Sequence, residues 1–295
     1  MADRRSTFSG SLTPWVFLAP QMLITAIFFL WPAGEAFYYS VLRQDPFGLS
    51  VKYVGLTNFE RLWNDPLYID AFWTTIVFSS LVAFFSLFFG LILALAADRV
   101  IAGRGIYRTL LLWPYAVAPA VASALWLFLL NPANGILHGW LEALGYDFNH
   151  NRKGFDAMAL VVTASVWRQV PYNFLFFLAG LMAVPKMLHD AAQMDGAGVV
   201  RRFFLVTVPM LSPITFFLLV INVVYALFDT FAVIHATTDG GPARATTTLV
   251  FKVYKDGNDG LSLGSAGAQS VILLVLVTAL TVFQFRAADK KVHYG

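Results

Sequence analysis

The sequence predicts an all-α membrane protein with six transmembrane helices, and three observations predict that class. Hydrophobic residues make up 58% of the 295 residues and charged residues only 13%, whereas soluble domains carry about 25% charged residues. The mean hydropathy is +0.68. Apolar runs also recur along the chain, each long enough to cross a bilayer as a helix of about 20 residues. So few charges cannot cover a water-soluble fold of this length, and lipid must form part of its surroundings.

Composition also excludes several kinds of chemistry. The chain has no Cys, which excludes disulfides, iron–sulfur clusters and thiolate metal sites. Its five His show no metal-ligand spacing, and no phosphate-binding loop or nucleophile elbow is present. A net charge of +3 is too small to indicate a nucleic-acid partner. We therefore expect no catalytic residue, metal or cofactor in this chain.

Six runs meet the length requirement for a transmembrane helix. The first is too long and begins too late for a simple signal peptide, and its polar exit "WPAGEAFYYSVLRQDP" lacks a small-residue cleavage site. We therefore predict that it is a true span. The predicted spans are residues 14–41, 71–97, 108–130, 157–182, 210–235 and 265–286.

The spans suggest three parts. Residues 1–70 hold an N-terminal tail, the first span and an outer loop; residues 71–286 form the main transmembrane domain; residues 287–295 form a tail.

Basic residues predict the orientation of the spans. With the N-terminus inside, eleven of the 20 Lys and Arg fall in inner segments and eight in outer segments, with Arg168 alone inside a span. The inner segments are short and basic, which is the setting in which the positive-inside rule applies, and the outer loops carry most of the acidic residues. We expect both termini in the cytoplasm and the chain to be a multi-pass protein of a bacterial inner membrane.

The loop between the fourth and fifth spans, residues 184–209, carries a specific pattern. Asp190-Ala191-Ala192 is followed after three residues by Gly196 and after a further nine by "VTVP", which ends at Pro209. Residues 185–194 can form a short amphipathic helix, and Gly196 permits a turn that a side chain would hinder. A basic interfacial loop that binds lipid headgroups through Arg201 and Arg202 is the general alternative.

This pattern resembles the Glu-Ala-Ala coupling loop of ABC-importer permeases, with conservative changes at Asp190, Val206 and Val208. The outer stretch "DGGPARATTTLVFKVYKDG" and the first span resemble those of carbohydrate-type importers. Along nearly the whole chain the sequence is similar to permeases of sn-glycerol-3-phosphate importers, and the stretches "LWPYAVAPAVASALW", "YNFLFF", "DGAGVVRRFF" and "VYALFDTFAVI" carry that similarity. Related permeases move different sugars, so a sugar or another polyol is the alternative cargo.

The resemblance implies a type I (MetI-like) permease fold and a set of partners. These are a second homologous permease, two ATP-binding subunits, a periplasmic substrate-binding protein and the lipid bilayer. ATP and Mg would bind to the partner ATPase, because this chain has no nucleotide motif. The expected mechanism is alternating access, in which the ATPase moves the coupling helix through Asp190, Ala191, Ala192, Gly196 and Pro209.

Polar residues inside the spans are the candidates for the substrate path. An ionisable side chain at that depth costs about 2.5–3.5 kcal/mol and usually faces protein or water. Arg168 therefore either contacts substrate or is paired with Asp229 or with backbone carbonyls. Three of the candidates share one face of the fifth span. The candidates are Arg168, Gln169, Asn173, Asn222, Tyr225, Asp229 and Gln269.

Two other classes of membrane protein fit the sequence less well. An ion-coupled secondary transporter often shows internal repeats, and no convincing repeat relates residues 1–150 to 151–295. A membrane-embedded enzyme would need paired carboxylates or a His cluster, and neither is evident. The sequence therefore favours the ATP-driven importer.

Overall fold

The computed structural model describes residues 13–45, 49–98 and 104–289, and nearly all of its regular structure is helical. The chain divides into two compact units. One holds residues 1–65 and 253–274, and the other holds residues 66–252 and 275–295. The second, larger unit contains most of the transmembrane helices.

The smaller unit consists of one long helix, a hairpin and short helical pieces. The helix is interrupted by a π-helical turn that contains no proline, and β1 pairs with β2 in antiparallel register, with Leu42 opposite Tyr53. Its elements are α1 (Thr13–Thr25), η1 (Ala26–Leu30), α2 (Trp31–Ser40), β1 (Leu42–Gln44), β2 (Val51–Tyr53), α3 (Thr57–Trp63), η4 (Lys255–Asp259) and the start of α14 (Leu263–Asp289).

Asn58 and Gly267 hold the smaller unit together. The buried Asn58 amide donates to the carbonyl oxygens of Ser40 and Leu42, each at 2.8 Å, where the chain leaves α2 for β1. At Gly267 on α14, a Cβ atom would lie 2.8 Å from the carbonyl oxygen of Ala36. Glycine is therefore required for the close approach of α14 to α2.

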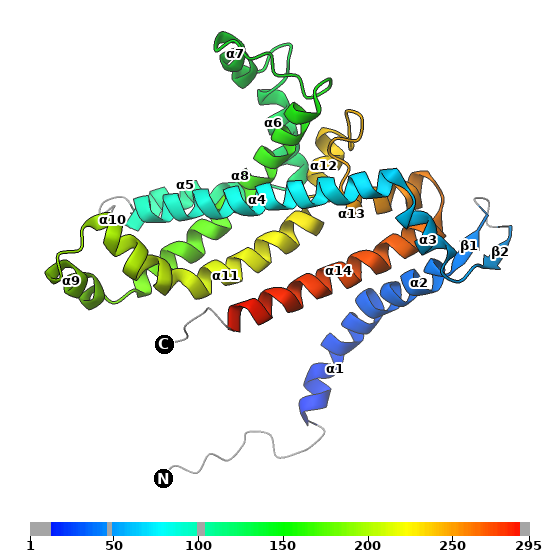
Figure 1. Cartoon of the computed structure of the whole chain (residues 1–295), viewed down its shortest axis with the longest axis horizontal. Coiled ribbons are helices and arrows are strands. Elements are labelled where there is room, and N and C mark those ends of the chain that lie inside the picture. The colour runs from blue at the N-terminus through cyan, green and yellow to red at the C-terminus, as the bar shows by residue number, and fades with distance from the viewer. Residues whose placement is uncertain (1–12, 46–48, 99–103, 290–295) are drawn as a thin grey trace. The chain divides into compact units, whose positions relative to one another are not determined.

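The larger unit is a helical bundle (Figure 1). Helices α4, α8 and α11 pack together, and α6 and α7 project from them (Figure 1). Its elements are α4 (Pro66–Asp98), α5 (Arg104–Ala116), α6 (Pro119–Leu129), α7 (Ile136–Ala143), α8 (Gly154–Ala183), α9 (Lys186–Met194), α10 (Val199–Arg202), η2 (Phe203–Thr207), α11 (Val208–Val224), η3 (Tyr225–Asp229), α12 (Phe231–Thr237), most of α13 (Leu249–Tyr254) and the end of α14.

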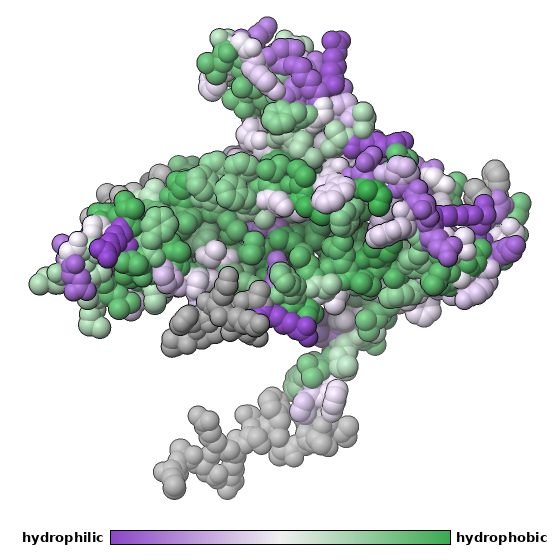
Figure 2. Space-filling model, in the orientation of Figure 1, coloured by the Kyte–Doolittle hydropathy of each residue, from purple (hydrophilic) through white to green (hydrophobic). Residues whose placement is uncertain are grey.

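Within the described residues, four continuous helices are long and apolar enough to cross a membrane: Pro14–Ser40, Pro66–Asp98, Val199–Asp229 and Leu263–Arg286. Two further pairs of consecutive helices, Thr109–Ala116 with Pro119–Leu129 and Gly154–Ala183 with Lys186–Met194, are each bent at a short break. The number of spans is six if each bent pair counts as one span. These four helices and two pairs correspond to the six predicted spans. Figure 2 shows hydrophobic side chains over the long helices of the larger unit, with hydrophilic residues gathered at α9 and near α7.

The prediction of a continuous third span over residues 108–130 was wrong. Thr109–Ala116 and Pro119–Leu129 meet at an angle of 106°. Ala118 is extended, with a ψ of 143°, because a residue that precedes proline is disfavoured in the helical region. Pro119 then begins α6 in the first turn, where its missing N–H is not needed.

The predicted bounds of the fifth span, 210–235, were also wrong. The helix begins at Val199 and ends at Asp229, so the last part of the predicted loop 184–209 is helical. A π-helical turn at Phe203–Thr207 precedes Pro209. Pro209 lacks a backbone N–H donor, which would normally interrupt a helix. The wider π-helical turn before it accommodates this missing hydrogen bond, so the helix continues across Pro209.

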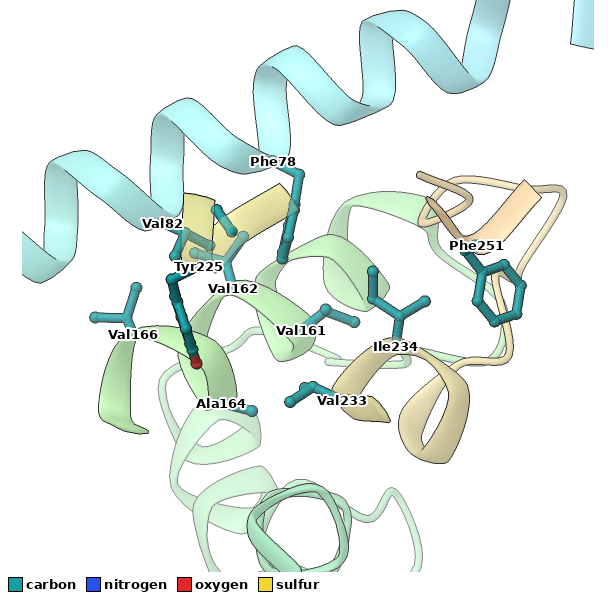
Figure 3. Packing of buried hydrophobic residues seen from close by; sticks show 11 residues of the cluster. Phe78, Val82, Val161, Val162, Ala164, Val166, Tyr225, Val233, Ile234 and Phe251 are labelled. Atoms are coloured by element: carbon teal, nitrogen blue, oxygen red, sulfur yellow. The ribbon is translucent and has the colours of Figure 1, made fainter. Parts of the chain in front are cut away.

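The core of the larger unit lies where α4, α8, η3, α12 and α13 meet. Phe78 and Val82 of α4 belong to one cluster with Val161 and Val166 of α8, and Ile234 of α12 lies beside Val161 (Figure 3). A second cluster joins α4, α8 and α11 further along the bundle. These contacts fix α8 and η3 relative to each other, and both elements carry candidate site residues.

Candidate functional site

The break between α5 and α6 forms one wall of a polar cavity. Helix α5 ends at Ala116. The carbonyl of Val117, just beyond this end, therefore lacks the N–H donor that the next helical turn would supply. The Nε atom of Arg168 donates to this oxygen at 3.1 Å. Irregular backbone at membrane depth is tolerated where protein groups satisfy it. Arg168 therefore stabilises the break and is itself fixed in position by it.

The cavity beside this break has a volume of about 420 Å³. Helices α5, α6, α8 and α11 and the turn η3 contribute its walls. The lining residues are Tyr115, Pro119, Arg168, Gln169, Tyr172, Ile221, Val224, Tyr225 and Asp229. The structure thus brings together four of the seven predicted substrate-path residues.

Arg168 has unused hydrogen-bonding capacity. Its Nη1 atom is buried and has no hydrogen-bond partner among the described residues. Its Cζ atom lies 6.0 Å from the centre of the Tyr225 ring, at the limit of a cation–π contact. In the described part of the chain no ion pair joins Arg168 to Asp229. Of the pairings considered from the sequence, the backbone carbonyl is therefore the one observed.

Tyrosines supply the aromatic part of the cavity. The hydroxyl of Tyr225 donates to the carbonyl oxygen of Ser165 at 3.0 Å, which fixes that ring. The rings of Tyr115 and Tyr172 lie 5.7 Å apart. Sequence reasoning missed both of these residues. Tyr172 follows Arg168 by four residues and so shares its helical face, a signal that could have found it, whereas Tyr115 reaches the cavity only because the third span is broken.

Asn173 and Asn222 do not line the cavity. Both are fully buried, and their amides exchange two hydrogen bonds of 3.0 and 2.7 Å between α8 and α11. Asn222 also donates to the carbonyl oxygen of Leu218 at 2.7 Å. Hydrogen bonds of this kind hold helices together inside a membrane, so the two residues fasten the wall behind the cavity.

Gln269 lies in the smaller unit. Its amide nitrogen donates to Asp256 at 2.5 Å and contacts Ser265 at 3.1 Å. It therefore braces α14 against η4 within that unit.

The predicted amphipathic helix in the coupling loop is present as α9. Its end forms a paired hydrogen-bond motif: the N–H of Gly196 donates to Gln193 at 3.0 Å, and the N–H of Ala197 donates to Ala192 at 2.9 Å. This Schellman arrangement requires a left-handed residue after the helix. Gly196 supplies it with a φ of +78°, so the turn predicted at this glycine is confirmed.

The coupling loop presents an exposed surface. Asp190 and Ala191 are exposed, as are the apolar side chains of Met187, Met194 and Val199. The Nη1 atom of Arg202 donates to the side chain of Gln193 at 2.7 Å and so ties α10 to α9. Exposed apolar residues gathered on one element typically mark an interaction site.

The arrangement is suited to binding rather than to bond chemistry. The described residues contain no group of three metal ligands. The cavity offers a guanidinium group with an unpaired donor, an amide, hydroxyl groups and one carboxylate. Arg can donate two parallel hydrogen bonds to a carboxylate or phosphate. The site can therefore hold a small, polar, oxygen-rich solute inside the helical bundle.

Comparison with known proteins defines the class. The family described as the inner membrane component of binding-protein-dependent transport systems matches residues 8–294. The chain belongs to this family, and the expected ABC-importer permease class and inner-membrane location are confirmed. It is a transport component rather than an ATPase.

Within this family, the chain is similar over its whole length to several named permeases. The chain is 54% identical to the sn-glycerol-3-phosphate transport system permease protein UgpA of Pectobacterium atrosepticum and 55% identical to that of Yersinia enterocolitica, in each case over 294 residues and 100% of both chains. It is 53% identical to the protein of the same name from Salmonella typhimurium.

Solved structures confirm the fold. A bacterial ABC transporter involved in the import of the acidic polysaccharide alginate superposes with a TM-score of 0.80 at 20% identity, over 94% of this chain and 95% of that one. The alginate transporter in complex with a pentasaccharide-bound periplasmic protein gives the same TM-score at 21% identity, over 96% of each chain. The predicted type I permease fold is therefore present.

Proposed function

We propose that the chain is the translocating subunit for sn-glycerol-3-phosphate and glycerophosphodiesters. The observation that carries the proposal is the buried Nη1 atom of Arg168, which lies beside a polar cavity and has no hydrogen-bond partner among the described residues. A phosphate ester needs a cation to offset the cost of entering a medium of low dielectric constant. The relatives named above, at 53–55% identity over their whole length, are permeases for this solute.

The cavity suits both ends of such a molecule. Arg168 and Gln169 can donate to the phosphate oxygens, and Asp229 can accept hydrogen bonds from the glycerol hydroxyls. Tyr225 lines the same cavity as Arg168 and Asp229. The second permease subunit would close the site from its open side.

Transport would depend on partners. In the proposed cycle, two ATP-binding subunits dimerise with bound ATP and Mg, and each permease docks its coupling helix on one of them. For this chain that helix is α9, with Asp190, Ala191 and Ala192 at the contact, Gly196 at its end and Pro209 where α11 begins. The exposure of α9 and the relationship to a transporter solved with its periplasmic protein support this arrangement. Both termini and α9 would lie in the cytoplasm.

Reconstitution tests the function. The chain is assembled in vesicles with its companion permease, ATPase and binding protein, and uptake of labelled sn-glycerol-3-phosphate is measured beside maltose and free glycerol. We expect ATP-dependent uptake of the phosphate ester alone. Uptake of the sugar without the phosphate ester would show that the cargo is wrong, and uptake that persists without the ATPase would show that the class is wrong.

A further inference from the structure

A second, apolar hollow lies on the other side of the α5–α6 break. It has a volume of about 830 Å³ and lies among α4, α5, α6 and α8. Its lining contains no charged side chain, and Thr163 provides its only aliphatic hydroxyl group. We call this hollow the apolar groove. It is distinct from the polar cavity, with which it shares no lining residue.

The groove opens onto the apolar surface of the larger unit. Leu110 is 63% exposed and Phe155 is 77% exposed, and both lie at its rim. They belong to α5 and α8, which form parts of the membrane-spanning helix pairs. Acyl chains are the surrounding medium at this depth, so an apolar hollow open to the bilayer is filled by hydrocarbon unless protein covers it.

Three tryptophans line the groove where α5, α6 and α8 come together. Trp167 of α8 lies between the two arms of the break, with its ring 5.3 Å from that of Trp113 on α5 and 6.2 Å from that of Trp126 on α6. Both contacts are edge-to-face, a favourable geometry for aromatic pairs. Trp167 thus links both arms of the bent α5–α6 pair at the wall of the groove.

The same short segments form a wall between the groove and the cavity. Trp167 lines the groove, and the next residue, Arg168, lines the cavity. On α5, Pro114 lines the groove and the next residue, Tyr115, lines the cavity. A change in what fills the groove would thus displace residues that also shape the substrate path.

We propose that the apolar groove binds one acyl chain of a phospholipid and that this chain supports the bent α5–α6 pair. Its volume lies within the range of about 300–1,000 Å³ that is typical of small-molecule sites. A membrane-spanning helix about 10 Å across and about 30 Å long occupies more than twice the volume of the groove. The size and the uncharged lining therefore favour a lipid tail over a helix of the second permease. This proposal does not depend on the identity of the cargo.

Native mass spectrometry of the complete transporter tests the proposal. The complex is released into detergent from nanodiscs of defined phosphatidylethanolamine and phosphatidylglycerol, and retained phospholipids are counted. We expect the unmodified complex to retain a phospholipid and Thr163→Phe, which fills the groove, to lose it. Ala279→Phe is the control, because Ala279 lies on the exposed face of α14 and away from the groove. Absence of lipid from the unmodified complex, or equal retention by Thr163→Phe, would refute the site.

A second measurement does not depend on the fold of that variant. A photo-crosslinking residue is introduced in place of Thr163 in the assembled transporter, and the adducts are identified. A phospholipid adduct supports the proposal. An adduct with the companion permease instead would show that the groove is a protein interface and that the lipid site is wrong. Uptake of sn-glycerol-3-phosphate is measured in parallel, so that failure of the lipid site is distinguished from failure of the proposed cargo.

Discussion

Arg168 donates a hydrogen bond of 3.1 Å to the carbonyl oxygen of Val117, and this contact joins α8 to the break between α5 and α6. One end of the guanidinium group is thereby used to hold the wall of the cavity. The buried Nη1 atom at the other end has no partner among the described residues. The bond to Val117 is therefore structural, and the binding role that we propose for Arg168 falls to the other end of the same side chain.

Substitution of Arg168 separates these roles. A hydrogen bond to a charged group contributes about 1.5–3 kcal/mol, which corresponds to about a tenfold to hundredfold loss of affinity. We expect Arg168→Gln to insert and assemble but to lose sn-glycerol-3-phosphate uptake by about this factor, and Arg168→Lys to recover part of it. Unchanged uptake by correctly inserted Arg168→Gln would contradict the binding role, and loss of insertion would show that the bond to Val117 dominates.

The turn at Gly196 should be sensitive to substitution for a backbone reason. The φ of +78° disfavours any side chain, although an added Cβ atom would meet nothing within 4 Å. We expect Gly196→Leu to abolish coupled ATPase activity and transport while the spans remain inserted. Gly198→Leu is a matched control, because Gly198 has a φ of −66° and equally open surroundings. Equal loss in both variants would show that bulk, rather than backbone geometry, is responsible.

The predicted orientation can be tested on a background free of thiols, because the chain has no Cys. Met194 at the end of α9 is 88% exposed, and Ala243 in the predicted outer loop is also exposed. In intact spheroplasts we expect an impermeant maleimide to label Ala243→Cys and to spare Met194→Cys until the membrane is permeabilised. The reverse labelling pattern would show that the chain has the opposite orientation in the membrane.

The pair formed by Asn173 and Asn222 should contribute to stability rather than to recognition. Interhelical hydrogen bonds in membranes contribute about 0.6 kcal/mol on average and at most about 1.7 kcal/mol. We expect Asn173→Ala and Asn222→Ala each to lower the free energy of unfolding within this range, with the double variant less affected than the sum. Unfolding in denaturing detergent measures this coupling. A change in substrate affinity at unchanged stability would instead place the pair in the substrate path.

The segment that precedes α8 should respond to pH. Burial lowers the pKa of His150 below its ordinary value of 6.5, and the nearby carboxylate of Asp156 opposes this shift in part. Asp156 is itself held by the Tyr146 hydroxyl at 2.5 Å and by the Asn149 N–H at 2.6 Å. Above pH 6.5 the ring is neutral in both folded and unfolded states, so the full stability is present. Below 6.5 the unfolded segment binds the proton first, and stability is lost as the pH falls through the folded pKa.

Hydrogen exchange of residues 144–153, corrected for intrinsic rates, measures this effect. We expect less protection at pH 5 than at pH 7 and expect His150→Gln to reduce the difference. His189→Gln on α9 serves as the control. A pH dependence that is unchanged in His150→Gln would assign it to another group.

The sequence by itself determined the membrane class, the number of apolar segments, and the short helix and glycine turn between the fourth and fifth spans. These features are local. Hydrophobic runs of the required length specify spans because hydrogen bonds within a helix satisfy the backbone in lipid. The turn at Gly196 follows from the preference of glycine for positive φ, which depends on no distant contact. Arg168 was a candidate for the substrate path because the cost of burying a charge can be read from its position in a span.

Only the tertiary structure decided which polar residues meet. All seven candidates were polar positions in apolar segments, yet Asn173 and Asn222 satisfy each other, Gln269 contacts Asp256, and Arg168 reaches a carbonyl 51 residues away. That carbonyl is available because α5 and α6 meet at 106°, and residues on both sides of the break determine the angle. Hydrogen-bond partners inside a bundle depend on the distances between helices that are remote in sequence. The hydropathy pattern of the chain does not determine those distances.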